Sequence, residues 1–174
     1  MKRLCRLSFS PGFTLVEIIV ALLLLGIVAI FGGQLLTTAI QGYIQARSTD
    51  EVAQKAQVAL QRMVIEFSYI AKGDSSTSGN ANSFSYNAAS LGQHTIQLDG
   101  TNILYTQDGS QYIMLDGIAA NGLQFKYYDS FNSTVSTSFG QKTTVIGITL
   151  VMHGDSWPAN LNKVFSTRTT LKGF

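Results

Sequence analysis

The chain has 174 residues, of which 45% are hydrophobic and 13% charged, and its formal net charge is +2. This length accommodates one modest globular domain beside one membrane span, which excludes an arrangement of several domains. A net charge so close to zero gives no footprint of the basic surface on which nucleic-acid binding depends, so no nucleic-acid partner is expected.

The N-terminal region combines a short basic segment with a long apolar one. Lys2, Arg3 and Arg6 precede an apolar run from Phe13 to Phe31. As a helix, this run of about 19 residues has a length of about 28 Å, close to the thickness of the hydrocarbon core of a bilayer. Because basic residues stay on the cytoplasmic side of a span, we expect a cytoplasmic N-terminus and a periplasmic remainder.

Glu17 is the only charged residue in this apolar run. An acidic side chain inside a membrane span costs on the order of 2.5–3.5 kcal/mol by insertion scales, so its presence calls for a partner or a role. The segment around it reads Gly-Phe-Thr-Leu-Val-Glu at residues 12–17. This segment, followed by an apolar helix, resembles the processing site of type IV pilins and type II secretion pseudopilins.

The resemblance implies roles for three residues. In that family a membrane-embedded aspartyl peptidase, the prepilin peptidase, cuts after the glycine, here between Gly12 and Phe13, and the new terminal amine of Phe13 is methylated. The glutamate, here Glu17, meets the N-terminal ammonium of a neighbouring subunit in the filament. Two unit charges about 4 Å apart attract by roughly 4 kcal/mol at an effective dielectric constant near 20, which is comparable to the cost of inserting the carboxylate.

The resemblance also divides the chain into four parts. It implies a removable leader at residues 1–12, a transmembrane and filament-core helix at 13–40, an amphipathic helix at 41–72 and a periplasmic, β-rich, pilin-like domain at 73–174. Loss of the three leader cations takes the side-chain charge from +2 to about −1. Cys5, the sole cysteine, leaves with the leader, so the mature chain has no disulfide and no cysteine-based metal site.

Other interpretations of the N-terminus fit less well. In an ordinary secretory signal peptide the basic and apolar segments are not separated as they are here by residues 8–12, and no small-x-small cleavage site follows the apolar run. A lipoprotein signal requires an apolar segment before Cys5, which is lacking. A signal-anchor helix with an accidental Glu17 stays open as an alternative, although Phe13, Thr14 and Glu17 together argue against accident.

The helical pattern continues beyond the apolar run. One face carries apolar residues at steps of three or four: Val52, Ala56, Leu60, Met63, Phe67 and Ile70. We therefore expect one helix over Phe13–Lys72, ended by Gly73 and supported by an i,i+4 pair of Glu51 and Lys55. Gly32–Gly33 is expected to loosen it, because each glycine costs about 1 kcal/mol of helix stability relative to alanine.

The rest of the chain has the signature of β-structure. Residues 73–83 contain no large apolar side chain and are expected to form a surface loop, as is the Ser- and Thr-rich segment Phe131–Phe139. Turn signals occur at Asp99-Gly100 and Asp108-Gly109. The predicted strands are Phe84–Tyr86, Thr95–Leu98, Asn102–Thr106, Gln111–Leu115, Gly122–Asp129, Thr143–Met152 and Lys163–Leu171.

Alternation within two of these strands indicates a sheet with one buried face. Leu123, Phe125 and Tyr127 are expected to point inward. The intervening Gln124, Lys126 and Tyr128 are expected to point outward, and a second inward set is Ile146, Ile148 and Leu150. The expected fold is α+β and pilin-like, with a long N-terminal helix laid across an antiparallel sheet.

No catalytic or metal-binding constellation is found in the sequence. His94 and His153 are the only histidines, have no companions at metal-ligand spacing and are expected on strand surfaces. Asp99, Asp108 and Asp116 each precede a glycine in a separate turn, which favours turn chemistry over the calcium site that some pseudopilins carry. We expect no enzymatic activity, no metal and no cofactor.

The sequence therefore predicts a structural minor pilin or pseudopilin of the bacterial inner membrane that later enters a filament. The lack of cysteines in the mature chain, the late strands and the long helix resemble minor subunits more than major ones. Expected partners are the prepilin peptidase, other pilin or pseudopilin subunits, the inner-membrane assembly platform and the lipid bilayer. The alternatives are a non-polymerising, single-pass anchor that presents a periplasmic binding domain, and an adhesive or DNA-uptake pilin.

Overall fold

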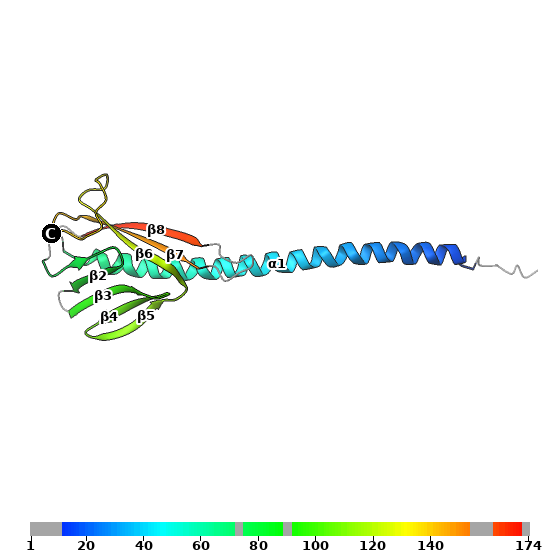
Figure 1. The fold of residues 1–174 in the computed structure, drawn as a ribbon, viewed down its shortest axis with the longest axis horizontal. Helices are drawn as coiled ribbons and strands as arrows, with labels where there is room; N and C mark the ends of the chain where they lie inside the picture. Colours follow the sequence, from blue (N-terminus) through cyan, green and yellow to red (C-terminus); the bar gives the residue numbers. More distant parts are fainter. Residues whose placement is uncertain (1–11, 72–74, 89–91, 154–161, 172–174) are drawn as a thin grey trace, which may run out of the picture. The chain divides into compact units, whose positions relative to one another are not determined.

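The computed structural model describes residues 12–71, 75–88, 92–153 and 162–171. The chain divides into two compact units, residues 1–43 and 44–174. Helix α1, Leu15–Ser68, is followed within the described residues by strands β1 to β8 (Figure 1). One long N-terminal helix combined with antiparallel sheets confirms the predicted α+β, pilin-like class.

Helix α1 is shorter at both ends than the predicted range Phe13–Lys72. It begins two residues later and ends at Ser68. Beyond that point the backbone N–H groups of Tyr69 and Ile70 bond to carbonyls three residues earlier, each at 3.2 Å, so the last turn tightens and the α-helix stops. The predicted stop at Gly73 lies outside the described residues.

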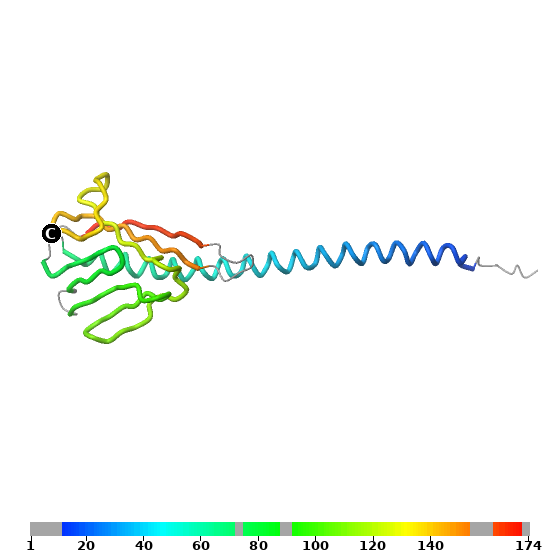
Figure 2. The backbone as a smooth tube through the Cα atoms, in the orientation of Figure 1, coloured from blue at the N-terminus to red at the C-terminus, as the bar shows by residue number. Residues whose placement is uncertain are grey.

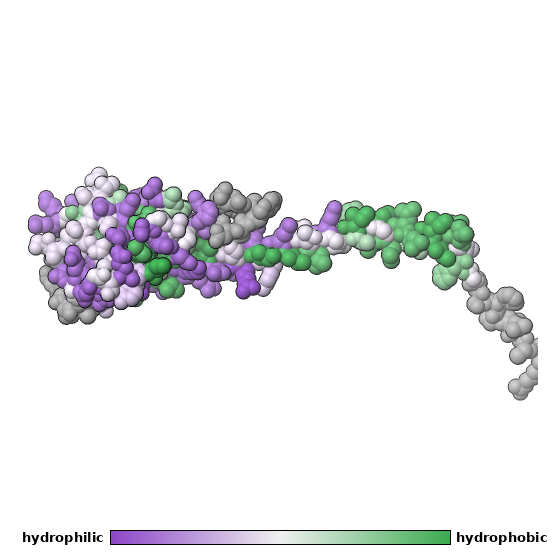
Figure 3. All heavy atoms as spheres, turned by 60° about the horizontal axis from the view of Figure 1, so that its bottom comes forward, coloured by the Kyte–Doolittle hydropathy of each residue, from purple (hydrophilic) through white to green (hydrophobic). Residues whose placement is uncertain are grey.

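The first unit is the exposed, apolar part of α1. Of the described residues, α1 is the one helix long and apolar enough to cross a membrane, and its most apolar 18-residue stretch has no buried residue. Figure 3 shows hydrophobic side chains covering this part of the helix. The helix is continuous through Gly32 and Gly33, and the Thr37 hydroxyl donates to the Gly33 carbonyl at 2.9 Å. The expected loosening of the helix at these glycines stays a prediction.

The second unit contains two antiparallel sheets rather than the single sheet that we expected. Strands lie in the order β1-β2-β3-β4-β5 in one sheet and β6-β7-β8 in the other (Figures 1 and 2). Two sheets form because β6 pairs with β7 and not with the preceding strand β5. The bounds are β1 Ser78–Gly79, β2 Ser83–Ala88, β3 Gly92–Asp99, β4 Asn102–Gln107, β5 Ser110–Leu115, β6 Ile118–Tyr128, β7 Val145–Met152 and β8 Lys163–Thr170.

Strand β1 lies inside the segment predicted to be a surface loop, and that prediction was wrong there. Gly79 packs so closely that an added Cβ would lie 2.3 Å from the hydroxyl oxygen of Tyr127 and 2.6 Å from the ring of Phe84. Its carbonyl accepts a hydrogen bond from the backbone N–H of Phe139 at 2.9 Å. Aromatic rings from other elements cover the glycine, which explains why the segment needs no large apolar residue of its own.

The predicted inner face of α1 is confirmed, and it serves both sheets. Ala56, Leu60, Met63 and Phe67 are buried, Val52 is half-buried against the same core, and Ile70, just beyond the end of the helix, is also buried. The Phe67 ring lies 4.7 Å from that of Phe84 on β2 and 5.9 Å from that of Phe125 on β6, measured between centroids. A single helix face therefore joins the two sheets into one hydrophobic core.

The predicted alternation on β6 is correct except at Tyr128. Leu123, Phe125 and Tyr127 are buried as expected, but Tyr128 on the opposite face is also buried, at 6% exposure. A Cβ added to Gly147 on β7 would lie 3.1 Å from the Tyr128 ring, so the ring covers that glycine. The Arg168 guanidinium from β8 stacks on the Tyr128 ring, 4.6 Å from the ring centroid.

Both predicted hairpin turns are present. Asp108 and Gly109 have φ angles of 48° and 82° between β4 and β5, the two positive values that a type I′ turn requires. Gly100, at φ 60°, opens the turn between β3 and β4.

Candidate functional site

The expected cleavage position lies just ahead of the helix. Residues 12–14 have no regular secondary structure and are exposed, with the Phe13 side chain 81% exposed. No heavy atom lies within 4 Å of a Cβ built on Gly12. None of the described residues therefore restricts position 12 to glycine by contact.

Thr14 is the N-cap of α1. Its side-chain Oγ1 accepts a hydrogen bond from the backbone N–H of Glu17 at 3.3 Å, and its carbonyl accepts from the N–H groups of Glu17 and Ile18 at 3.1 and 3.3 Å. Thr14 and Glu17 thus stand at the first and last positions of a Thr-x-x-Glu pattern, the signature of a capping box. We did not use this signal in the sequence, although it marks the start of the helix.

Glu17 occupies the first turn of α1, where a negative charge is favoured by the helix dipole by about 0.3–1 kcal/mol. Its side chain is exposed, and the described residues give its carboxylate no ion pair. The large apolar side chains that follow it along the helix are also exposed. They include Ile18, Leu22, Leu25, Val28 and Phe31. An exposed charge and an exposed apolar surface thus lie together at this end of the helix.

Residues 10–32 match the family described as the prokaryotic N-terminal methylation motif. This match supports a type IV pilin-like protein. The matched segment contains all three residues expected at the processing site, Gly12, Phe13 and Glu17. Proteins with this motif are processed by a prepilin peptidase, assemble with other pilins and have structural rather than enzymatic roles. No curated protein sequence and no solved structure matches the chain significantly.

The histidines of the globular unit lie in different environments. His153 is exposed at the end of β7. The expectation that His94 lies on a strand surface was wrong, since this side chain is only 2% exposed. His94 Nδ1 shares a hydrogen bond of 2.6 Å with the Tyr105 hydroxyl and lies 3.9 Å from Glu66 Oε2.

Glu66 connects this cluster to helix α1. The Tyr86 hydroxyl donates to Glu66 Oε2 at 2.8 Å, and the Tyr105 hydroxyl donates to Oε1 at 3.5 Å. Burial and, second, the Glu66 carboxylate raise the pKa of Tyr86 and of Tyr105, so both hydroxyls keep their protons. The Arg62 guanidinium lies 4.8 Å from the centroid of the Tyr105 ring. The cluster is a set of satisfied hydrogen bonds between α1 and the five-stranded sheet, which makes its role structural.

The three aspartates considered for calcium lie at separate places. Asp99 ends β3, Asp108 lies in the β4–β5 turn, and the Asp116 carboxylate binds the Lys55 ammonium of α1 at 3.1 Å. Across the parts of the chain that the structure describes, no group of three His, Cys, Asp or Glu residues is arranged to hold a metal ion.

Proposed function

We propose that this pilin-like protein is a minor pilin or pseudopilin, cleaved between Gly12 and Phe13, methylated on the Phe13 amine and inserted into a filament through Glu17. One observation carries the proposal. The helix exposes its apolar surface and places, in its first turn, a carboxylate for which the described residues hold no ion-pair partner. The methylation motif at residues 10–32 supports the same interpretation.

The energetics favour a neighbouring subunit as the source of the missing partner. Inserting a carboxylate into a bilayer costs on the order of 2.5–3.5 kcal/mol, and an ammonium about 4 Å away recovers roughly 4 kcal/mol at an effective dielectric constant near 20. Cleavage creates that ammonium on Phe13. The exposed, non-helical segment before Leu15 offers the peptidase an accessible backbone.

We place the uncleaved protein in the bacterial inner membrane as a single-pass protein. The basic residues 2, 3 and 6 favour a cytoplasmic N-terminus, and the globular unit is then periplasmic. The partners would be the prepilin peptidase, the assembly platform, the bilayer and other pilin or pseudopilin subunits. Glu17 favours a position below the filament tip, because the tip subunit of the family often lacks this carboxylate.

The test is to determine the N-terminus by mass spectrometry after co-expression with a prepilin peptidase. We expect a methylated Phe13 terminus in the wild type and an intact leader in Gly12→Ala. Gly26→Ala is the matched control, because a Cβ at that glycine also meets no heavy atom within 4 Å and processing should continue. An intact leader in the wild type would contradict the proposal and would favour a non-polymerising membrane anchor instead.

A further inference from the structure

Two strands of the globular unit have one unpaired edge each. Within the described residues β5 pairs only with β4, and β8 pairs only with β7. In Figures 1 and 2 these two strands lie on opposite sides of the unit, with α1 between them. Each edge presents backbone N–H and C=O groups that an added strand can use.

Strand β5 lacks the protection that exposed edges usually carry. Its residues from Ser110 to Leu115 include no charge and no proline. Tyr112 and Ile113 on this strand are 58% and 65% exposed. An uncharged, partly apolar edge of this kind is suited to strand addition by another chain.

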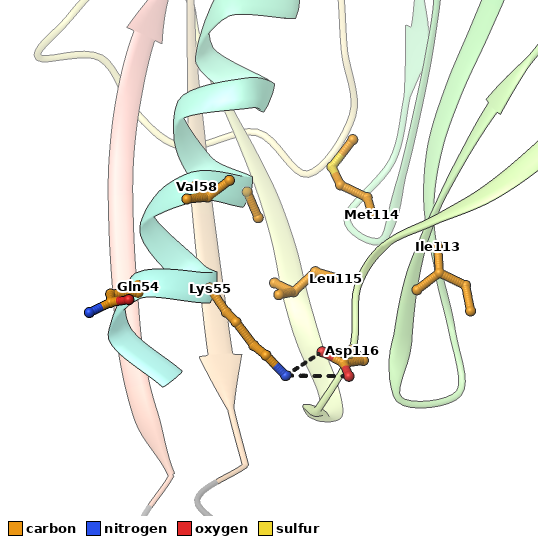
Figure 4. Close-up of a pocket in the computed structure, with 8 residues that line it drawn as sticks. Gln54, Lys55, Val58, Ile113, Met114, Leu115 and Asp116 are labelled. Carbon is orange, nitrogen blue, oxygen red and sulfur yellow. Dashed lines mark hydrogen bonds and ion pairs between the residues drawn. The ribbon is translucent and has the colours of Figure 1, made fainter. Parts of the chain in front are cut away.

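A groove runs beside this edge, between β5 and helix α1 (Figure 4). Its apolar lining comes from Val58 of the helix and from Ile113, Met114 and Leu115 of the strand. A register shift between β4 and β5 leaves Met114 as an extra residue, which places three consecutive β5 side chains around the groove. A strand added beside β5 would project every second side chain over this groove.

Charge is concentrated at one end of the groove. The Asp116 carboxylate binds the Lys55 ammonium at 3.1 Å, and Glu51 Oε1 lies 3.8 Å from the same nitrogen. Two carboxylates against one ammonium leave a net charge of about −1 at this end. The groove therefore favours an apolar side chain with a cation beside it.

Strand β8 carries that combination. Val164 is 64% exposed, an apolar side chain that the described core does not use. Lys163 precedes it, and residues 163–170 contain two cations, Lys163 and Arg168, and no acidic residue. Strand β8 thus combines an unpaired edge, an exposed apolar side chain and a cation, and it lies on the side of the unit opposite the groove.

We propose that the β5 edge and its groove receive strand β8 of a second copy of this chain, with Val164 over the groove and the basic strand, which carries Lys163 and Arg168, next to the acidic end. The proposal deepens the proposed function and rests on it, because such a contact matters only in a filament. The two surfaces are different, so the contact is head-to-tail and leaves one β5 edge and one β8 edge free at the ends of every assembly. Contacts of this kind build open, helical arrays rather than closed dimers.

The test is disulfide cross-linking of the full chain in membranes that contain the prepilin peptidase and the assembly platform. Cys5→Ser removes the native thiol, and Gln111→Cys and Ser166→Cys place one thiol on each edge strand. The chain carrying both cysteines should give a ladder of dimers, trimers and longer products under mild oxidation. Gln111→Cys with Thr134→Cys, an exposed loop position, is the matched control and should give no ladder.

Two results would overturn the edge contact. One is a paired variant that cross-links no more than the control. The other is a dimer formed by the variant with Gln111→Cys alone, which indicates that the β5 edges of two copies pair with each other. Mass spectrometry of the N-terminus in the same sample separates the two proposals. A cleaved chain without a ladder contradicts the contact alone, and an uncleaved chain contradicts the function on which it rests.

A second variant tests the side chain assigned to the groove. Val164→Asp puts a carboxylate beside Asp116 and Glu51, so the ladder of the paired-cysteine chain should be lost. Val135→Asp changes a similarly exposed valine, 53% exposed, and should preserve the ladder. Equal ladders from both variants would show that Val164 does not lie in the contact.

Discussion

Helix α1 runs through two regions that differ in how far their apolar side chains are buried. In the first unit, Leu22 and Leu25 are 65% and 69% exposed, and no described residue covers them. In the second unit, Met63 and Phe67 of the same helix are fully buried by strands from the same chain. The globular unit therefore provides its own core, while the first unit leaves its apolar surface exposed.

The largest effect expected within the second unit comes from Phe67. Phe67→Ala removes a ring that contacts both sheets, and large-to-small changes of this kind cost about 3–5 kcal/mol. Urea unfolding, followed by tyrosine and tryptophan fluorescence, should show the loss. Tyr69→Ala, at a side chain 70% exposed, is the control and should change the unfolding free energy by about 0.5 kcal/mol or less. Similar losses in the two variants would contradict the core assigned to α1.

The matching change in the first unit is Glu17→Gln, which should affect assembly and leave folding intact. We expect the share of the protein in sheared filaments to fall about tenfold or more, because each 1.4 kcal/mol of lost attraction is roughly tenfold in an equilibrium. Immunoblots of filament and membrane fractions measure this share. Asp50→Asn removes an exposed carboxylate in the second unit that does not line the groove, and it should leave the share unchanged. Wild-type incorporation of Glu17→Gln would contradict the assigned role of the carboxylate.

The second unit should also lose stability in alkali. Burial raises the pKa of Tyr86, Tyr105 and Tyr127 above the ordinary value of 10.0. Above pH 10 the unfolded chain releases these protons while the folded unit keeps them, so the unfolding free energy should fall by about 1.4 kcal/mol per pH unit for each such group. Urea unfolding at several pH values measures the slope. Tyr86→Phe should make it shallower, and an unchanged slope would contradict the Tyr86 assignment.

The smallest expected effect concerns the start of α1. Thr14→Ala removes the N-cap and should destabilise the first turn by about 1 kcal/mol. Amide exchange in micelles should then be faster at Glu17, and Thr14→Ser should restore the wild-type rate. Thr38→Ala, which removes a hydroxyl bonded to the Gln34 carbonyl, should leave exchange at Glu17 unchanged. Faster exchange in Thr14→Ser as well would show that the hydroxyl is not the cap.

The parts of the fold that depend on local periodicity could be predicted from the sequence. The inner face of α1 and the inward residues of β6 and β7 follow helical and strand spacing, and these predictions were correct. The two-sheet arrangement, the cover of Gly79 by Tyr127 and the contact of His94 with Glu66 depend on residues far away in the chain, which spacing does not reveal. The candidate site was recognisable because residues 12–17 form a contiguous motif. The cap made by Thr14 was also visible there and was missed.

The position of Phe67 between the two sheets has a consequence for the order of folding. Each sheet is a sequence of neighbouring antiparallel strands whose contacts are local, which favours fast formation. Docking of both sheets on α1 is the non-local step. Since the helix is synthesised before any strand, each new hairpin meets a template that already exists, and the unit should mature in chain order, from β2 towards β8.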